Sequence, residues 1–323
     1  MSRRIIVDTD TAGDDVQALL LACLTDRLRL EAVTIVAGNV PFDRQVENAK
    51  YTLSLVGADD TPVYEGARGP LLKDFHHVEH IHGAGGLGGN LHPKTGIPSA
   101  EEFAPAEIVR RCRAAPGEYT LLCIGPLTNL ALALSQEPAL PELVDEVWMM
   151  GGAVHCEGNV TPAAEYNVWV DPDAAKRVFE AFEVTLVDWG LSLRDSLLRP
   201  DGVDAVQNLE GKLADVIGGI IAPVYEFTRT EQDVDGVPQP DSLTAALLAY
   251  PELRRETTTY AVEVDERSGL TRGYLSVDVN GGSGTSAQTR VVESADRAAF
   301  CDVVLGMLRD RDPDQRFRNR EGK

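Results

Sequence analysis

The sequence contains little positive charge, and lysine is scarce. Of 323 residues only six are lysine, and 30 Lys and Arg residues stand against 51 Asp and Glu residues, so the formal net charge is −21. Proteins that bind nucleic acids hold the phosphates with clustered Lys and Arg side chains, and a field of this sign would repel them. We therefore expect no nucleic-acid partner.

Long apolar runs and paired cysteines are also missing. No uninterrupted apolar run approaches the ~20 residues of a membrane span, and the first residues lead directly into a short β-branched run without the apolar stretch of a signal peptide. The five cysteines are widely spaced and lack a CxxC pair, which argues against a disulfide framework or a zinc ribbon. We expect a cytoplasmic protein with buried thiols and no membrane partner.

Short β-branched runs alternate with amphipathic segments through the first two thirds of the chain. The pattern predicts strands at residues 5–8, 30–37, 119–124, 146–150 and 184–187, and helices at residues 14–24, 42–56, 127–136 and 173–182. Repeated strand–helix–strand units form parallel sheets that are covered on both faces.

The last third of the chain follows a different pattern. Two helical stretches at residues 213–230 and 243–248 precede expected strands at 257–264, 273–279 and 289–292 and a closing helix at 298–308. No linker separates this part from the rest. We predict one domain over residues 1–323, an open, mostly parallel, doubly wound α/β sheet with helices on both faces and a small C-terminal antiparallel addition.

Four carboxylates lie at the end of the first expected strand and the start of its helix: Asp8, Asp10, Asp14 and Asp15. In a doubly wound sheet, ligands bind beyond the carboxyl ends of the strands, so this is a favourable place for a site. One aspartate at a helix start would serve as a cap, but four would repel one another unless a cation lay among them. Because no Cys or His accompanies them, they favour Ca²⁺ or Mg²⁺ over zinc.

Other expected strand ends carry compatible polar groups. Asn39 follows the second strand, and a polar loop at residues 158–172 contains Asn159, Glu165 and Asn167. Amide and carboxylate groups offer both donors and acceptors, which suits a polyhydroxylated ligand such as a sugar. Two segments rich in Gly and polar residues, 66–99 and 151–167, exceed the usual length of a connection, and such segments are usually functional or mobile.

Taken together, these segments resemble the nucleoside hydrolase family of the inosine–uridine preferring type. The opening Asp-x-Asp-x-x-x-Asp-Asp signature of that family fits Asp8, Asp10, Asp14 and Asp15, with Thr11 in place of the usual proline. The similarity continues, in the expected order, at residues 36–39, 82–89, 125–129, 150–152, 159–172 and 241–245. It implies hydrolysis of the N-glycosidic bond of ribonucleosides, tightly bound Ca²⁺ and assembly into a homodimer or homotetramer.

The resemblance also implies roles for individual residues. Asp10, Asp15, Asp241 and the backbone carbonyl of Ile124 would hold the Ca²⁺, and Asp10 would take a proton from the attacking water. The substrate-binding residues would be Asp14, Asn39 and Asn167 at the ribose 2′- and 3′-hydroxyls, Asn159 and Glu165 at the 5′-hydroxyl, and Met150 under the sugar.

One departure from the family pattern concerns the leaving group. Many members place a histidine immediately before the metal-binding aspartate, where it donates a proton to the departing base, but this chain has Pro240 before Asp241. General-acid assistance contributes about 10²–10⁴ in rate, and proline cannot supply it. His82 is the first candidate for a replacement catalytic acid, and Tyr225 or Tyr166 is the alternative.

Two other functions remain open from the sequence. A non-catalytic nucleoside- or ribose-binding relative could have kept the metal and sugar groups and lost the acid with Pro240. The run from Asp8 to Asp10 after an apolar strand also resembles haloacid-dehalogenase phosphatases, but those enzymes need a lysine, and the second strand ends in Asn39. The preferred base is not predictable, because base contacts would come from the variable residues 66–99 and 227–240.

Overall fold

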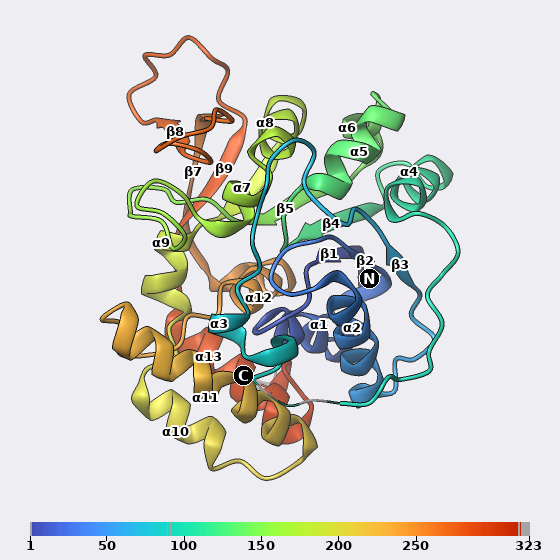
Figure 1. Ribbon diagram of the computed structural model, residues 1–323, viewed down its shortest axis with the longest axis vertical. Helices are drawn as coiled ribbons and strands as arrows, with labels where there is room; N and C mark the ends of the chain where they lie inside the picture. Colours follow the sequence, from blue (N-terminus) through green and yellow to red (C-terminus); the bar gives the residue numbers. More distant parts are fainter. Residues whose placement is uncertain (1, 89, 91, 316, 318–323) are drawn as a thin grey trace.

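Nine strands form one sheet in the part of the chain that the computed structural model describes, residues 2–88, 90, 92–315 and 317. They are β1 (Arg3–Thr9), β2 (Leu28–Ile35), β3 (Val63–Glu65), β4 (Tyr119–Cys123), β5 (Glu146–Met150), β6 (Val184–Val187), β7 (Arg254–Val264), β8 (Leu275–Asp278) and β9 (Thr289–Ala295). Their order is β3-β2-β1-β4-β5-β6-β9-β7-β8 (Figure 1). Strands β1 to β6 are parallel, β9 is parallel to β6, and β7 is antiparallel to both β9 and β8.

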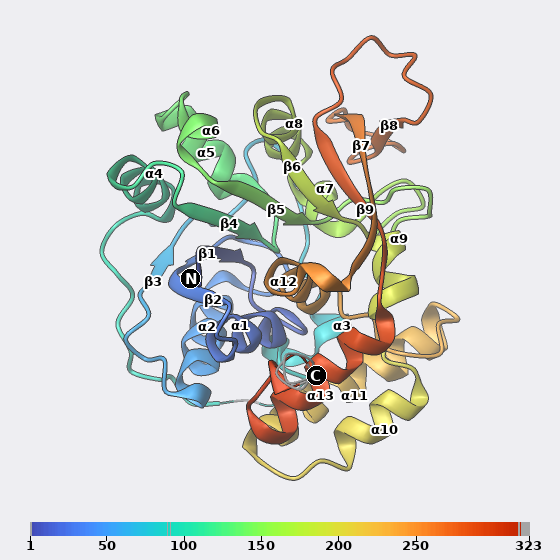
Figure 2. The same ribbon diagram turned by 180° about the vertical axis from the view of Figure 1, so that it is seen from behind.

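Helices cover both faces of this sheet. They are α1 (Asp15–Leu24), α2 (Phe42–Val56), α3 (Glu79–His82), α4 (Ala104–Ala114), α5 (Thr128–Gln136), α6 (Leu140–Leu143), α7 (Tyr166–Val170), α8 (Pro172–Ala181), α9 (Trp189–Leu191), α10 (Pro200–Gln207), α11 (Lys212–Glu231), α12 (Pro240–Ala249) and α13 (Arg297–Asp310). Helices α4, α5, α6 and α8 lie on one face, and α1, α2, α12 and α13 lie on the other (Figures 1 and 2).

Alternate residues of the central strands enter two separate hydrophobic cores. In β1, Ile5 and Val7 belong to the core that contains α1 and α12, whereas Ile6 belongs to the core that contains α4 and α5. Because both faces are buried, these strands appear in the sequence as continuous apolar runs. The alternation of such strands with amphipathic helices is what predicted the parallel sheet.

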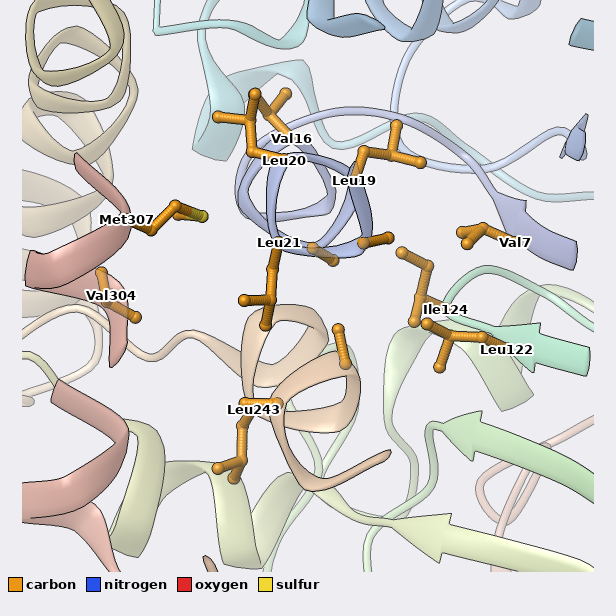
Figure 3. Close-up of a cluster of buried hydrophobic side chains, with 14 of the residues drawn as sticks. Val7, Val16, Leu19, Leu20, Leu21, Leu122, Ile124, Leu243, Val304 and Met307 are labelled. Atoms are coloured by element: carbon orange, nitrogen blue, oxygen red, sulfur yellow. The ribbon is translucent and has the colours of Figure 1, made fainter. Parts of the chain in front are cut away.

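Helix α1 is buried and anchors the acidic segment that precedes it. Figure 3 shows its side chains packed against the sheet on one side and against α12 and α13 on the other; the labelled residues are Val16, Leu19, Leu20, Leu21, Val7, Leu122, Ile124, Leu243, Val304 and Met307. Burying each large aliphatic side chain contributes about 1.5–3 kcal/mol. The packing fixes the N-termini of α1 and α12 side by side, and both carry predicted site residues.

The strand order reverses between β1 and β4, because the chain builds the sheet outward from β1 in one direction through β2 and β3 and then returns to β4 on its other side. Connections leave the two strands toward opposite faces at such a switch point and open a crevice beyond their carboxyl ends. Asp10 follows β1 and Ile124 follows β4. The fold therefore brings two of the predicted Ca²⁺ ligands to one place.

The predicted fold class is confirmed, with differences in detail. The sequence pattern missed β3, α4 and α10, and it treated residues 158–172 as loop, whereas α7 lies there. Strand β3 has three residues and α7 has five, and neither length is enough to show a periodic signal. The C-terminal addition is continuous with the main sheet, because β9 pairs with β6. Among the described residues, every helix is too short or too polar to span a bilayer.

Candidate active site

A cavity of about 230 Å³ lies at the carboxyl ends of β1, β4 and β5. It is lined by nine of the residues that the sequence singled out: Asp14, Asn39, His82, Ile124, Met150, Asn159, Glu165, Asn167 and Asp241. Asp10 and Asp15 are fully buried next to this lining. The structure therefore brings together all the predicted site residues, from segments that are more than 200 positions apart in the chain.

Asp8 points away from the other three carboxylates of its motif. Its Oδ1 accepts hydrogen bonds from the hydroxyl of Thr34 and from Nδ2 of Asn129, at 2.7 Å for the latter. Burial raises the pKa of Asp8 to about 7. Through Oδ1 the side chain ties β1 to β2 and to α5, and its Oδ2 is buried without a hydrogen-bond partner among the described residues.

The carboxylate of Asp10 is closely surrounded by the backbone of Gly38, Asn39 and Gly125. Its Oδ2 accepts a 2.8 Å hydrogen bond from the backbone N–H of Asn39, and its Oδ1 is buried without a partner in the described part of the chain. A Cβ atom on Gly38 would lie 2.0 Å from Oδ2, and one on Gly125 would lie 2.9 Å from Oδ1. Only glycine therefore fits at these two positions, and Oδ1 remains free to accept a proton or to bind a cation.

The other three carboxylates lie at the N-termini of α1 and α12. Asp15 accepts hydrogen bonds from the Thr9 hydroxyl at 2.5 Å and from the Ala12 N–H at 3.1 Å. The Asp14 carboxylate accepts a 2.8 Å hydrogen bond from the backbone N–H of Asp241. These bonds orient the carboxylates, and they connect the two helix ends directly.

Burial and mutual repulsion shift the acidity of this cluster. Burial is the main cause, and it raises the pKa of Asp14 to about 6 and that of Asp15 to about 7. The pKa values of Asp10 and Asp241 are raised well above the usual range by burial and by the neighbouring carboxylates. Carboxylates held this close resist ionisation unless a cation compensates them.

The donor set fits a hard divalent cation, although it is not an assembled coordination shell. Among the described residues, no three His, Cys, Asp or Glu side chains are arranged so that they alone could hold a metal ion. All predicted donors are oxygens, and within the described part of the chain Oδ1 of Asp10 is buried without a partner and no Lys or Arg lines the cavity. Ca²⁺ takes about 6–8 oxygen ligands, including carbonyls and water. The Ile124 carbonyl faces this region and accepts a 3.2 Å bond from Asn167.

Helix α7 begins at the site and positions two of the predicted ribose ligands. Glu165 is its N-cap and accepts hydrogen bonds from the N–H groups of Asn167 and Gly152, at 2.8 and 2.7 Å. Asn167 donates from Nδ2 to the carbonyls of Ile124 and Met150, both at 3.2 Å. The short helix thus links the ends of β4 and β5, and Asn159 supports it by accepting from the Tyr166 N–H at 2.8 Å.

The candidates for the leaving-group acid differ in their surroundings. His82 lines the cavity, its Nδ1 is buried without a partner, and burial lowers its pKa to about 4. Its imidazole is therefore neutral at pH 7. The Tyr166 hydroxyl lies within hydrogen-bonding distance of the backbone carbonyls of Gly38 and His76. Tyr225 is not among the lining residues, and its hydroxyl bonds to Asp235. The role predicted for His82 stays a prediction.

One wall of the cavity is apolar, and the sequence predicted only the part of it that lies within residues 227–240. This wall consists of Ile220, Ile221, Val224, Phe227 and Thr228 from α11 together with Val237 and Pro238. The exposed ring of His80 packs edge to face with Phe227, with 5.8 Å between the ring centroids. The sequence located this helix but could not show that part of its apolar face lines a cavity, because a buried stripe looks the same in either case.

Arg272, in the connection between β7 and β8, holds α7 and the rim of the cavity together. It donates hydrogen bonds to the carbonyls of Trp169, Val170 and Asp74, at 2.8, 3.0 and 2.9 Å. Its guanidinium lies 4.1 Å from the centroid of the Trp169 ring. The side chain therefore satisfies the C-terminal carbonyls of the helix that carries Asn167, and it connects the C-terminal addition to the site.

Replacing Arg272 with alanine is expected to raise KM by roughly 10-fold, because a small displacement of a positioning group is costly, and to lower the stability by about 1–3 kcal/mol. Arg272→Lys should recover part of both losses. Arg267→Ala is the matched control, since Arg267 lies in the same connection and its hydrogen bonds to described residues all go to Asp265. Steady-state kinetics and thermal unfolding measure both effects, and a KM equal to that of the control would contradict the role of Arg272.

Comparison with known proteins agrees with this geometry. The family model described as inosine-uridine preferring nucleoside hydrolase matches residues 5–302. The pyrimidine-specific ribonucleoside hydrolase RihA of Shewanella woodyi is 32% identical over 310 residues, which cover 95% of this chain and 98% of that protein.

Solved structures show the same fold. A plant nucleoside hydrolase superposes with a TM-score of 0.89 at 26% identity, covering 95% of this chain and 99% of the other. The purine-preferring ribonucleoside hydrolase of Gardnerella vaginalis gives a TM-score of 0.87 at 26% identity, covering 95% and 98%. One of these relatives is named as specific for pyrimidine ribonucleosides and another as preferring purine ribonucleosides.

Proposed function

Because the chain belongs to the inosine-uridine preferring nucleoside hydrolase family, we propose that it hydrolyses the N-glycosidic bond of ribonucleosides with the help of one bound Ca²⁺, giving free base and ribose. The observation that carries this proposal is the convergence of Asp10, Asp14, Asp15 and Asp241 beside one cavity, which no lysine or arginine of the described residues lines. Membership of this family leaves the phosphatase alternative without support.

We propose that Asp10, Asp15, Asp241 and the Ile124 carbonyl hold the cation. When bound, Ca²⁺ would increase the acidity of a neighbouring water and offer coordination sites to the ribose hydroxyls. Asp10 is the residue placed to take the proton from the attacking water, because its Oδ1 has no other partner and its Oδ2 is fixed by Asn39.

The remaining residues would bind the sugar and stabilise its charge. Asp14, Asn39 and Asn167 are assigned to the 2′- and 3′-hydroxyls, and Asn159 and Glu165 to the 5′-hydroxyl, with Met150 under the ring. Glycoside hydrolysis proceeds through an oxocarbenium-like transition state. Carboxylate and amide oxygens that are already fixed by hydrogen bonds stabilise this developing positive charge without reorganising.

His82 is proposed to stand beside the departing base and to assist it by hydrogen bonding from its neutral imidazole. We expect His82→Ala to lower kcat on neutral nucleosides. The homodimer or homotetramer, the cytoplasmic location and the single domain over residues 1–323 also stay predictions.

Removal of the cation is expected to make the stability strongly dependent on pH. Asp14 and Asp15 have pKa values of about 6 and 7 in the folded chain, raised by burial from an unfolded value near 4. Groups of this kind stabilise the fold below pH ~4 and lose that contribution as the pH rises through the folded pKa. The metal-free protein should therefore become less stable between about pH 4 and pH 7.

Thermal unfolding of chelator-treated protein, with and without added Ca²⁺, measures this effect. Because binding requires ionised carboxylates, Ca²⁺ should raise Tm by roughly 5 °C or more at pH 8 and by less at pH 5. An identical Tm with and without Ca²⁺ at pH 8 would contradict the metal assignment.

The proposed activity is tested by incubating the purified protein with inosine, adenosine, guanosine, uridine and cytidine and measuring the ribose released. We expect ribose release from at least one nucleoside, loss of that activity with a chelator and recovery with Ca²⁺. If a nucleoside protects the protein against thermal unfolding in a stoichiometric manner but no ribose appears, the chain is a binding protein and the proposal is wrong.

A further inference from the structure

Pro240 leaves the cavity without a buried proton donor beside the first turn of α12. The residue lines the cavity and begins that helix, and proline has neither a backbone N–H nor a titratable side chain. Its neighbour Gln239 is buried, and its amide is already bonded to the carbonyl of Pro238 and to Gln17. This part of the cavity can therefore contact a base but cannot protonate it.

Among the described lining residues, His82 can offer the base a hydrogen bond from a neutral imidazole, which does not replace a charged acid. His82 is the histidine whose ring lies against the site, directly over Gly13, and it is neutral at pH 7 as described above. The other lining histidines, His76 and His80, are exposed at the mouth, where their rings pack on Trp169 and Phe227. A neutral base that departs into this cavity would leave as an anion, next to carboxylates.

The charge of the site favours a cation at this position. Asp14, Glu165 and Asp241 line the cavity, Asp10 and Asp15 lie beside them, and no lysine or arginine is among the lining residues. These groups present carboxyl oxygens to the cavity, and no cationic side chain of the described residues competes there with a positively charged base. The apolar wall from α11 adds Phe227, and the face of an aromatic ring attracts positive charge.

We propose that the preferred substrates are ribonucleosides whose base carries a fixed positive charge, of which N7-alkylated purine ribosides are the simplest. This inference rests on the proposed hydrolase function and names its substrate class. The cavity combines the two properties that such substrates need, an excess of carboxylates and no requirement for an acid at the position of Pro240.

The bond changes balance without a general acid. The bond between C1′ and N9 breaks, and its electron pair moves to N9 and neutralises the positive charge of the base, which leaves as a neutral molecule. Water adds to C1′, and one of its protons passes to Asp10. With an uncharged purine, the same step gives an anionic base that must take up a proton.

The test compares 7-methylguanosine with guanosine, a pair that differs by one methyl group, at a mildly acidic pH where the methylated base keeps its charge. We expect kcat/KM to be at least about 10²-fold higher for 7-methylguanosine, which is the lower end of the usual contribution of general-acid catalysis. Because a charged base is also a better leaving group in water, a variant is needed to separate this effect from the absent acid.

Pro240→His introduces an acid at the position in question, and Pro240→Ala is the matched control that removes the ring without adding one. We expect Pro240→His to raise kcat/KM for guanosine by about 10-fold or more and to change that for 7-methylguanosine by less than about 3-fold. In Pro240→Ala, the ratio of kcat/KM for 7-methylguanosine to kcat/KM for guanosine should be the same as in the unchanged protein.

A binding measurement is independent of whether the histidine variant folds. With Asp10→Asn, which should not turn over its ligand, 7-methylguanosine is expected to bind several-fold more tightly than guanosine. Three results would overturn the inference. They are equal kcat/KM values for the two substrates in the unchanged protein, an equal rise in kcat/KM for both substrates in Pro240→His, and tighter binding of guanosine than of 7-methylguanosine to Asp10→Asn. If neither these two compounds nor the five common nucleosides release ribose, the hydrolase function itself is wrong.

Discussion

Replacing Asp10 with asparagine is expected to lower kcat for nucleoside hydrolysis by about 10²–10⁴-fold, the range that a general base contributes. Asparagine is nearly isosteric, so it should fit between Gly38 and Gly125 and keep an oxygen for the N–H of Asn39. It cannot take a proton from water. The expected result is therefore a folded protein with a small loss of Tm and a large loss of kcat.

Asp8→Asn is the matched control for this prediction, because Asp8 belongs to the same motif and is equally buried. Its carboxyl group accepts hydrogen bonds from Thr34 and Asn129, and an amide oxygen can accept them too. Asp8→Asn should keep kcat within about 3-fold, well below the effect of losing a general base. Equal losses in both variants would show that the effect of Asp10 is structural.

Gly38→Ala should produce the second large effect. The new Cβ atom would lie 2.0 Å from Oδ2 of Asp10, so the carboxylate or the loop that carries Asn39 must move. A displacement near 1 Å at a reacting group costs about 10² in rate. We expect kcat/KM to fall by about that factor, with a weaker response to added Ca²⁺.

Gly69→Ala serves as the control for the glycine variant. A Cβ atom at Gly69 has nothing within 4 Å, and its backbone does not adopt a positive φ. This variant should match the unchanged protein in kcat/KM and in Tm. An active Gly38→Ala protein would indicate that the position of Asp10 does not limit the reaction.

The sequence predicted the sheet because its signals are local. Continuous apolar strands such as residues 119–124 and amphipathic helices such as residues 42–56 carry their periodicity within one element. The acidic motif was informative for a similar reason, since four carboxylates lie between the end of one strand and the start of the next helix. The topological rule for parallel sheets then places that strand end at a ligand site.

The different roles of the aspartates in the acidic motif could not be predicted from the sequence. Asp8 and Asp10 are chemically identical and two positions apart, and their roles differ because Asp8 still belongs to β1 and pairs with neighbours on that strand's other side. Asp10 lies beyond the strand end, where Gly38 and Gly125 leave room for it. Such differences depend on residues that are distant in the chain.

Long-range contacts also explain why Arg272 and the α11 residues Ile220, Ile221 and Val224 were missed. Arg272 bonds to carbonyls about 100 and 200 positions away, and backbone carbonyls leave no mark in a sequence. The apolar face of α11 predicts burial but not whether its neighbour is a side chain or a ligand. Both features become visible only when the C-terminal third is placed against the site.

The central claim is that this acidic site breaks the bond between C1′ and the base by adding water. It is tested by allowing the reaction to proceed in ¹⁸O-labelled water with Ca²⁺ and no phosphate, using the nucleoside that is cleaved fastest, and by analysing both products by mass spectrometry. Our account predicts one ¹⁸O atom in the ribose and none in the base. Cleavage that requires phosphate and yields a sugar phosphate, or label in the base, would contradict it.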